Sequence, residues 1–203
     1  MNHRMKVKNF VFFLVIVGVA VLVRPRAAAA GEPTEQIRTA INEGVEIMNR
    51  ARLDSQSGKA ETIAKLKKIV YPLFDFDEMA RRSLGAHWRR LDPRQQKEFV
   101  TVFTELLEKT YAKNIDLYDG QRVVYAGENV DQDYAEVHTK LLSKKGESYS
   151  VDYRLRLVDG KWRVYDVVAE GISVVNNYRS QFNRVMANSS FEELIRKMKE
   201  RSA

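Results

Sequence analysis

An Asp159-Gly160 pair stands between two runs in which apolar and polar residues alternate. Asp-Gly between alternating runs is the strongest short-range signal for a β-hairpin with a two-residue turn. Such a turn also sets the pairing of the two strands. The facing pairs that it predicts are Leu157 with Trp162, Leu155 with Val164 and Tyr153 with Asp166.

The hairpin has one apolar and one polar face. The apolar face is expected to carry Tyr149, Val151, Tyr153, Leu155, Leu157, Trp162, Val164 and Val168, with Asp166 among them. The polar face is expected to carry Ser150, Asp152, Arg154, Arg156, Arg163 and Tyr165. A sheet of this kind needs apolar cover on one side. The cover is either the chain's own helices alone or helices together with a ligand.

The rest of the chain supplies helices before and after a meander of strands. Strands are predicted at 121–128, 134–142, 148–158 and 161–168, with helices within 34–118 and 172–201. Thr34 is expected to cap the first helix. The longest helix starts after Asp92-Pro93, and its apolar stripe of Phe99, Val100, Phe103, Leu106, Leu107 and Tyr111 makes it the expected lid of the sheet. This order predicts a single α+β domain over 31–203 with a four-stranded antiparallel sheet.

The first 30 residues have the pattern of a secretory signal peptide. A basic start is followed by an apolar run from Phe10 to Val23 and by Ala27-Ala28-Ala29-Ala30. The apolar run is shorter than the roughly 20 residues of a membrane span. We expect cleavage near Ala29 or Ala30 and export to the periplasm, with an uncleaved anchor as the alternative because Arg24 and Arg26 follow the run.

The net charge and the absence of cysteine exclude some functional classes for this protein. The formal net charge of +7 falls to about +2 without residues 1–30, which hold five cations and no acid. No basic block remains that would follow a phosphate backbone, so no nucleic-acid partner is expected. The absence of cysteine excludes disulfides, thiol chemistry and a cysteine-linked lipid anchor.

The sequence has few candidates for catalysis, and no cofactor or metal site is expected. His87 and His138 are not at metal-ligand spacing. Asp75 and Asp77 are interpreted as helix-start residues rather than metal ligands, because residues two apart on a helix diverge. Asp166, beside Tyr153, is either a general base of raised pKa or a structural carboxylate.

Several other residues have two interpretations. Trp88 either fills the core or borders a pocket, and Arg179 either binds a phosphate or pairs with a surface acid. Arg154, Arg156 and Arg163 form either a docking patch for an acidic partner or an ordinary solvated face. The aromatic side chains on the predicted inner faces fit both a packed core and a lined cavity, because periodicity does not separate the two.

Several segments together resemble the MlaC family, also called the toluene-tolerance family. They are Phe74-Asp75-Phe76-Asp77-Glu78-Met79-Ala80, Leu84-Gly85-Ala86-His87-Trp88-Arg89, Gln95 to Phe99, Val151-Asp152-Tyr153-Arg154, Trp162 to Ser173 and Asn177 to Phe182. The resemblance covers essentially the whole mature chain. A glycine often found before the last helix is replaced here by Asn188-Ser189-Ser190.

The resemblance implies a soluble periplasmic lipid carrier without catalytic residues. Such carriers pass phospholipid between an outer-membrane lipoprotein–porin complex and an inner-membrane ABC transporter with its lipid-binding hexameric subunit, and the system is linked to outer-membrane lipid asymmetry and organic solvent tolerance. The implied fold is a twisted antiparallel sheet wrapped by helices, related to the NTF2-like cone, with a helical subdomain. The acyl chains would lie between sheet and helices.

Side-chain direction then selects the residues expected to line that cavity. The sheet would contribute Tyr149, Val151, Tyr153, Leu155, Leu157 and Val164. The helices would contribute Phe99, Phe103, Leu106, Leu107, Val175 and Phe182, and Trp88, Tyr111 and Arg179 are rim or head-group candidates. Two other classes remain as alternatives: an enzyme of the NTF2-like cone with Asp166 as base on a small hydrophobic substrate, and an interaction domain with a solid core.

Overall fold

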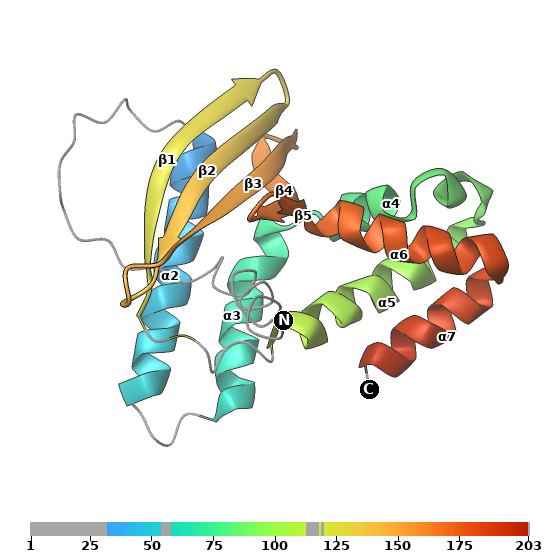
Figure 1. The fold of residues 1–203 in the computed structure, drawn as a ribbon, viewed down its shortest axis with the longest axis horizontal. Helices are drawn as coiled ribbons and strands as arrows, with labels where there is room; N and C mark the ends of the chain where they lie inside the picture. The colour runs from blue at the N-terminus through green and yellow to red at the C-terminus, as the bar shows by residue number, and fades with distance from the viewer. Residues whose placement is uncertain (1–31, 54–57, 113–117, 119, 203) are drawn as a thin grey trace.

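The computed structural model describes residues 32–53, 58–112, 118 and 120–202. It is an α+β fold in which an antiparallel sheet and two helices lie on one side and a group of helices lies on the other (Figure 1). The two helices beside the sheet are α2 (Glu32–Leu53) and α3 (Lys59–Leu73). The helical unit contains α4 (Phe76–Leu84), η2 (Gly85–Arg90), α5 (Pro93–Ala112), α6 (Val174–Asn188) and α7 (Phe191–Ser202).

The strands form one sheet in the order β1-β2-β3-β4-β5, with antiparallel neighbours throughout. Their bounds are β1 (Arg122–Asp131), β2 (Tyr134–Leu142), β3 (Ser148–Val158), β4 (Lys161–Ala169) and β5 (Ile172–Ser173). The fifth strand was not predicted. Glu170 and Gly171 both have positive φ and turn the chain back, so that Ile172 pairs with Ala169 before α6 begins.

The Asp159-Gly160 turn is confirmed, and both residues have the positive φ that this kind of turn requires. Leu157 pairs with Trp162 and Leu155 with Val164, as predicted. The register then shifts at a β-bulge, which leaves Tyr165 as the extra residue of β4. As a result Asp166 pairs with Arg154, and Val167 takes the predicted place of Asp166 opposite Tyr153. The prediction that Asp166 lies on the apolar face is therefore wrong.

The inner face of the sheet is covered by α2 and α3. Helix α2 contacts β1 and β2, packs against α3, and buries its stripe of Ile37, Ile41, Val45 and Met48. Thr34 does not cap this helix as expected; it lies in the first turn, and its N–H and hydroxyl both donate to the Glu128 carboxylate of β1 at 2.7 Å. These two hydrogen bonds fix the start of α2 on the sheet.

The prediction that α5 is the lid of the sheet is wrong. Its main contacts are with α4 and α7, and it lies in the helical unit beside the sheet (Figure 1). The apolar side chains of α5 find their partners on α6 and α7 instead, as the ring contacts of Phe99 with Phe182 and Phe191 show. Since these helices bury one another's apolar faces, α5 is not needed as cover for the sheet.

Most predicted helix starts are confirmed by their hydrogen bonds. The Asp75 carboxylate accepts a hydrogen bond from the Glu78 N–H at 3.0 Å, and the Asp92 carboxylate accepts hydrogen bonds from the N–H groups of Arg94 and Gln95.

Among the described residues, no helix is both long and apolar enough to span a bilayer. The predicted signal peptide at 1–30 lies outside the described residues.

Candidate functional site

A cleft of about 440 Å³ lies where the sheet unit meets the helical unit. Its walls are the end of α3, the start of α4 and one side of α5, and β4 contributes Arg163. The lining residues are Tyr71, Phe74, Asp75, Phe76, Asp77, Val100, Thr101, Thr104, Glu105 and Arg163. This volume is within the range of small-molecule binding sites.

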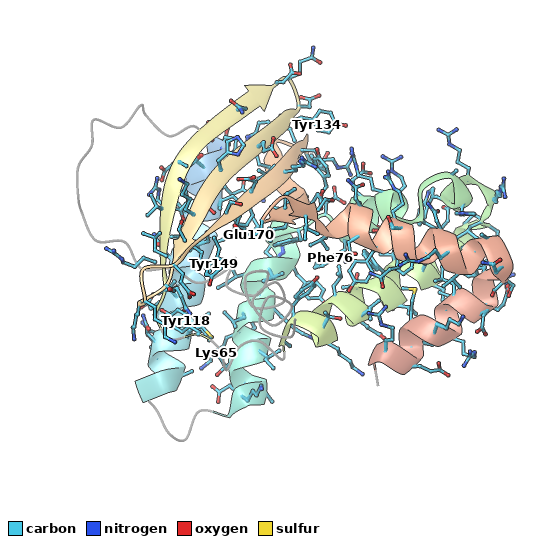
Figure 2. The ribbon with its side chains drawn as sticks, viewed as in Figure 1. Lys65, Phe76, Tyr118, Tyr134, Tyr149 and Glu170 are labelled. Carbon is cyan, nitrogen blue, oxygen red and sulfur yellow. The ribbon has the colours of Figure 1, made fainter. Side chains whose placement is uncertain are left out.

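The local sequence explains the wall between α3 and α4. Pro72 stands in the last turn of α3, and Phe74 is extended and forms a bridge with Val164 at the free edge of β4. The Asp75 N–H donates to the Val164 carbonyl at 2.8 Å before α4 begins. This short extended piece brings the ring of Phe76 to 5.9 Å from that of Phe74 and to 5.2 Å from that of Tyr71. Figure 2 shows Phe76 where the two units approach each other.

Arg163, which lines the cleft, and its neighbour Arg156, which does not, have different surroundings. Arg156 and Arg163 are paired residues on β3 and β4. Arg156 donates to the Asp75 carboxylate at 2.6 Å, so both charges are matched. Arg163 has no ion pair among the described residues, and its Nε is buried without a hydrogen-bond partner. A buried donor of a charged group without a partner is unfavourable, which makes Arg163 a candidate for binding a ligand.

The opposite wall is held to α3 by Glu108 of α5. Its carboxylate accepts hydrogen bonds from the Tyr71 hydroxyl and, at 2.6 Å, from the Lys67 ammonium. Burial and the hydrogen bond to Glu108 raise the pKa of Tyr71 to about 12. We call these three residues the α3–α5 clasp, because they join the two helices beside the cleft.

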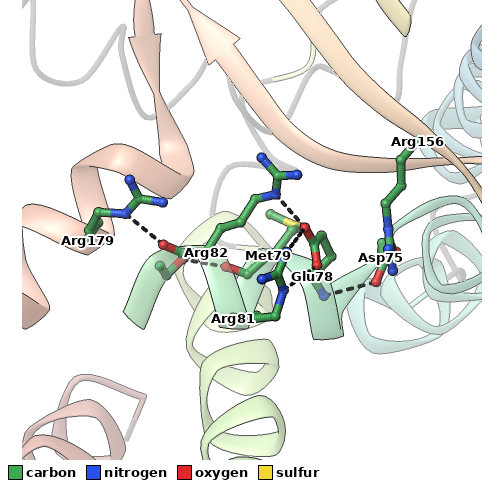
Figure 3. Close-up of polar contacts among 8 residues, drawn as sticks. Asp75, Glu78, Met79, Arg81, Arg82, Arg156 and Arg179 are labelled. Atoms are coloured by element: carbon green, nitrogen blue, oxygen red, sulfur yellow. Dashed lines mark hydrogen bonds and ion pairs between the residues drawn. The ribbon is translucent and has the colours of Figure 1, made fainter. Parts of the chain in front are cut away.

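A network of charges joins α4 to its neighbours (Figure 3). Glu78 is 4% exposed and accepts two hydrogen bonds from Arg81 and one from Arg82, all at 2.6–2.7 Å. Burial alone would raise the pKa of Glu78, but these hydrogen bonds outweigh it and the pKa is lowered. The Arg82 guanidinium also lies 4.1 Å from the ring centroid of Tyr165 on β4. Glu78 therefore holds in place the arginine that contacts the outer face of the sheet.

The predicted site residues of the sheet do lie together. Val151, Tyr153, Leu155 and Val164 are buried in the apolar layer, and Tyr149 and Leu157 are half-buried and pack against it. Burial raises the pKa of the Tyr153 phenol well above its usual value. This layer faces α2 rather than α5, because the bulge and the edge bridge of Phe74 place the helical unit beside the sheet.

The predicted site residues of the helices form a separate core. Phe99, Phe103 and Phe182 pack against one another with ring centroids 5.5–5.8 Å apart, and Leu106, Leu107 and Val175 are buried. The structure therefore divides the predicted set between two places. The side chains were assigned to one cavity on the assumption that α5 covers the sheet, which it does not. That these residues bind lipid stays a prediction.

The three rim candidates also lie in the helical unit. Trp88 is half-buried and meets Phe99 edge-on at 6.4 Å, as a core residue does. Burial and the neighbouring Tyr178 raise the pKa of Tyr111. The Arg179 Nε donates to the Arg82 carbonyl at 2.7 Å and so satisfies a carbonyl near the end of α4; the expected pairing with a surface acid is not what the described residues show.

Asp166 occupies a structural position at the start of α6. Its carboxylate accepts the Ser173 hydroxyl at 2.6 Å and the Val175 N–H at 3.1 Å, and lies 3.5 Å from Arg154. Both oxygens thus have partners on the outer side of β4. The geometry predicted for a general base, an acid beside Tyr153 in an apolar cavity, is not present.

The outer face of the sheet is not the simple arginine patch considered above. Arg154 forms an ion pair with Glu136 at 3.0 Å, and Arg156 forms an ion pair with Asp75. Glu136, His138 and Asp152 bring their ligand atoms within 4.8 Å of one another on this face. Within this group the Glu136 carboxylate is paired with Arg154, and the Asp152 carboxylate lies 3.1 Å from the Nδ1 atom of His138.

Sequence reasoning missed most of the cleft. Tyr71, Phe74, Phe76 and Arg163 were not among the predicted site residues, although Val100 was placed on the apolar stripe of its helix. The available signal was Pro72 followed by Phe74-Asp75-Phe76, because this segment ends one helix and begins the next at aromatic residues. Such a break indicates that the aromatic rings leave the regular helix face.

Comparison with known proteins identifies the family. The family model described as MlaC protein matches residues 38–200. The chain belongs to the MlaC family. The family resemblance inferred from sequence is thereby confirmed, and the match runs from within α2 to within α7.

Relatives of this MlaC chain are distant in sequence. The intermembrane phospholipid transport system binding protein MlaC of Haemophilus influenzae is 21% identical over 157 residues, 75% of this chain and 72% of its own length. The toluene tolerance protein ttg2D of Pseudomonas putida is 27% identical over 123 residues, 60% of this chain and 57% of its own. A phospholipid-binding protein of Ralstonia solanacearum, solved with a phospholipid, has a TM-score of 0.74 at 22% identity and covers 85% of this chain and 97% of its own. That likeness confirms the α+β fold.

Proposed function

We propose that this protein is a periplasmic carrier that holds a phospholipid by its acyl chains and moves it between membranes. The observation that carries the proposal is the cleft between α3 and α5, which has a wall of three aromatic rings in a chain of the MlaC family. The names of the two relatives and the phospholipid in the Ralstonia solanacearum structure support it.

Physical chemistry explains why a carrier is needed. A diacyl lipid has on the order of 30 methylenes, and each costs about 0.8 kcal/mol in water. Free diffusion across an aqueous gap would therefore cost on the order of 20 kcal/mol, which makes it negligible. The carrier must offer an apolar surface that is dry when filled, and it must also release its cargo.

We place the acyl chains between α3 and α5, with their ends directed toward the apolar layer of the sheet. Tyr71, Phe76 and Val100 would be the first side chains that they meet. Beyond the edge of β4 lie Val164 and Leu155, which belong to the apolar layer and were predicted as lining residues. A longer chain would need α3 and α5 to separate, because Val164 and Leu155 are fully buried in this structure.

The delivery partners follow from the same proposal. We infer that the protein receives and delivers lipid at an outer-membrane lipoprotein–porin complex and at an inner-membrane ABC transporter with a lipid-binding hexameric subunit. Docking at either membrane would have to weaken the hold on the lipid. The α3–α5 clasp is suited to this role because it joins the two walls of the cleft by hydrogen bonds rather than by a packed core.

Native mass spectrometry of the purified mature protein, with extraction of the bound lipid, tests the proposal. We expect phospholipid to co-purify with the wild type. Val100→Asp puts a charge in the cleft and should leave the protein largely empty, while the matched Val124→Asp, at a position of β1 that is 44% exposed, should retain lipid. Circular dichroism confirms that both variants are folded.

A second cleft variant tests whether the loss of lipid expected for Val100→Asp could come from a folding defect. Thr101→Trp fills the cleft from an exposed position of α5 and should also reduce bound lipid. Wild-type protein that is empty after purification, and that takes up no phospholipid from vesicles, would contradict the proposed function. Equal lipid content in all three variants would show that the lipid lies elsewhere.

A further inference from the structure

A cluster of side chains on the outer face of the sheet has the donor atoms of a metal site. Glu136 and His138 are two residues apart on β2 and so point to the same face, and Asp152 of β3 is the strand partner of His138. The ligand atoms of the three all lie within 4.8 Å of one another, and the side chains are 25–34% exposed. None of the three lines the cleft between α3 and α5.

We propose that Glu136, His138 and Asp152 bind one divalent metal ion of the class of zinc, nickel and copper. An imidazole nitrogen with two carboxylate oxygens is a donor set that these ions take, whereas Mg²⁺ and Ca²⁺ prefer oxygen ligands alone. Three protein ligands leave a fourth position open for water, which the partial exposure of the group allows. The inference does not depend on the proposed function.

The spacing of the ligand atoms is close to what a zinc ion needs. Zinc lies about 2.0–2.2 Å from nitrogen and oxygen ligands, which places tetrahedral ligands about 3.4 Å from one another. The Asp152 Oδ1 and His138 Nδ1 atoms are already 3.1 Å apart. Glu136 is therefore the ligand that would have to move, and its side chain lies on an open face of the sheet.

The other ring nitrogen of His138 has a partner of the kind found beside metal-bound histidines. A ligating histidine donates its second ring N–H to a hydrogen-bond acceptor, which fixes its tautomer and its orientation. The Nε2 atom of His138 lies 3.2 Å from the side-chain amide of Asn129 on β1. A turn of that amide presents its oxygen to an Nε2–H, and Nδ1 is then left as the metal ligand on the side of Asp152.

The charges around the group favour a cation. Arg154 forms an ion pair with Glu136 at 3.0 Å and also lies 3.5 Å from Asp166 of β4, so that two carboxylates share one guanidinium. Among the described residues, Asp152 forms no ion pair with a lysine or an arginine. When a metal ion binds Glu136, Arg154 keeps Asp166 as its partner. The ion would therefore supply the positive charge that the outer face lacks.

Zinc titration of the mature protein, made without a histidine tag and freed of metal by a chelator, tests the site. Calorimetry should show one zinc per chain with a dissociation constant of about 10 µM, because three partly exposed ligands hold zinc less tightly than a closed four-ligand site. His138→Ala should weaken binding by about tenfold or more, and His87→Ala, at the other described histidine, is the matched control and should bind as the wild type. Arg154→Gln should bind zinc about tenfold more tightly, because it frees Glu136.

Thermal unfolding gives a second measurement, and circular dichroism checks that each variant is folded. Zinc at about 100 times its dissociation constant should raise the unfolding midpoint of the wild type and of His87→Ala by about 5 °C, and it should leave His138→Ala almost unchanged. Wild type that binds no zinc at millimolar concentration, or His138→Ala that binds as tightly as the wild type, would overturn the site. Equal affinity for Mg²⁺ and zinc would overturn the assigned class of metal.

Discussion

Helix α5 has two apolar sides with different surroundings. One side, with Phe99 and Phe103, faces a closed core in which rings from α5, α6 and α7 contact one another. The other side, with Val100 and Thr104, faces the cleft, which is also lined by three aromatic rings and by Arg163, a cation without an ion pair among the described residues. The comparison teaches that aromatic content does not define a binding site. A site is marked by apolar walls together with polar groups that lack a partner.

The largest expected difference between the two sides is in stability. Phe103 is 0% exposed and touches the rings of Phe99, Tyr178 and Phe182. Phe103→Ala should lower the free energy of unfolding by about 3–5 kcal/mol, because it opens a cavity in a packed core. Val100→Ala should cost about 1 kcal/mol, since the cleft is already open beside it. Urea denaturation of both variants measures this, and equal losses would mean that the two sides are one core.

The second expected effect concerns the network that joins the two units. Glu78→Gln removes the charge that holds Arg81 and Arg82, and it should lower the free energy of unfolding by about 2 kcal/mol at neutral pH. Since the pKa of Glu78 is lowered in the folded protein, its contribution is present above its usual value of 4.5 and is lost as the pH falls further.

Urea denaturation between neutral pH and pH 3 checks this prediction. The difference between wild type and Glu78→Gln should shrink as the pH falls, while the exposed Glu98→Gln should stay close to the wild type throughout. A difference that persists unchanged at low pH would show that the carboxylate charge of Glu78 is not the source of the stabilisation.

The third expected effect concerns lipid exchange. Glu108→Gln weakens both hydrogen bonds of the α3–α5 clasp and should remove about 1 kcal/mol of the energy that holds α3 and α5 together. Transfer of fluorescent phospholipid to acceptor vesicles should then be about fivefold faster. The matched variant Glu43→Gln, on an exposed position of α2, serves as control. Unchanged transfer would mean that these two helices do not move apart when lipid leaves.

The smallest expected effect is a pH dependence of the same clasp. Burial and Glu108 raise the pKa of Tyr71 to about 12, so its contribution is present below pH 10 and is lost as the pH rises toward 12. Tyr71→Phe should therefore be slightly less stable than wild type at pH 9, and this difference should disappear near pH 12. Chemical denaturation of both proteins across this range measures it. A difference that grows with pH would have the wrong sign.

Much of the fold could be predicted because local signals decide it. Asp159-Gly160 fixes a two-residue turn, and the predicted strands 134–142 and 148–158 agree with β2 and β3. Asp75 and Asp92 mark helix starts because their side chains accept backbone N–H groups. These features depend on residues close in sequence, which is why a single chain suffices to find them.

Three features depend on contacts that the sequence does not reveal. The bulge at Tyr165 moves Asp166 to the outer face, where its carboxylate accepts hydrogen bonds from Ser173 and from the start of α6. The apolar stripe of α5 is divided between the helical core and the cleft, although helical periodicity places all of its residues on one face. The extended Phe74 joins the edge of β4 and so creates the cleft. Each of these features depends on contacts between residues that are far apart in the sequence, and each changes the candidate site.

The most direct test of the central claim is the position of the acyl chains relative to α5. Because the chain has no cysteine, Val100→Cys, Val124→Cys and Phe103→Cys each provide a single site for a small fluorophore. Phospholipids with brominated acyl chains should quench the probe at position 100 strongly and leave the probe at position 124 of β1 unaffected, with position 103 in the helical core quenched weakly. Strong quenching at position 103 with none at position 100, or equal quenching at positions 100 and 124, would contradict a phospholipid site in the cleft between α3 and α5.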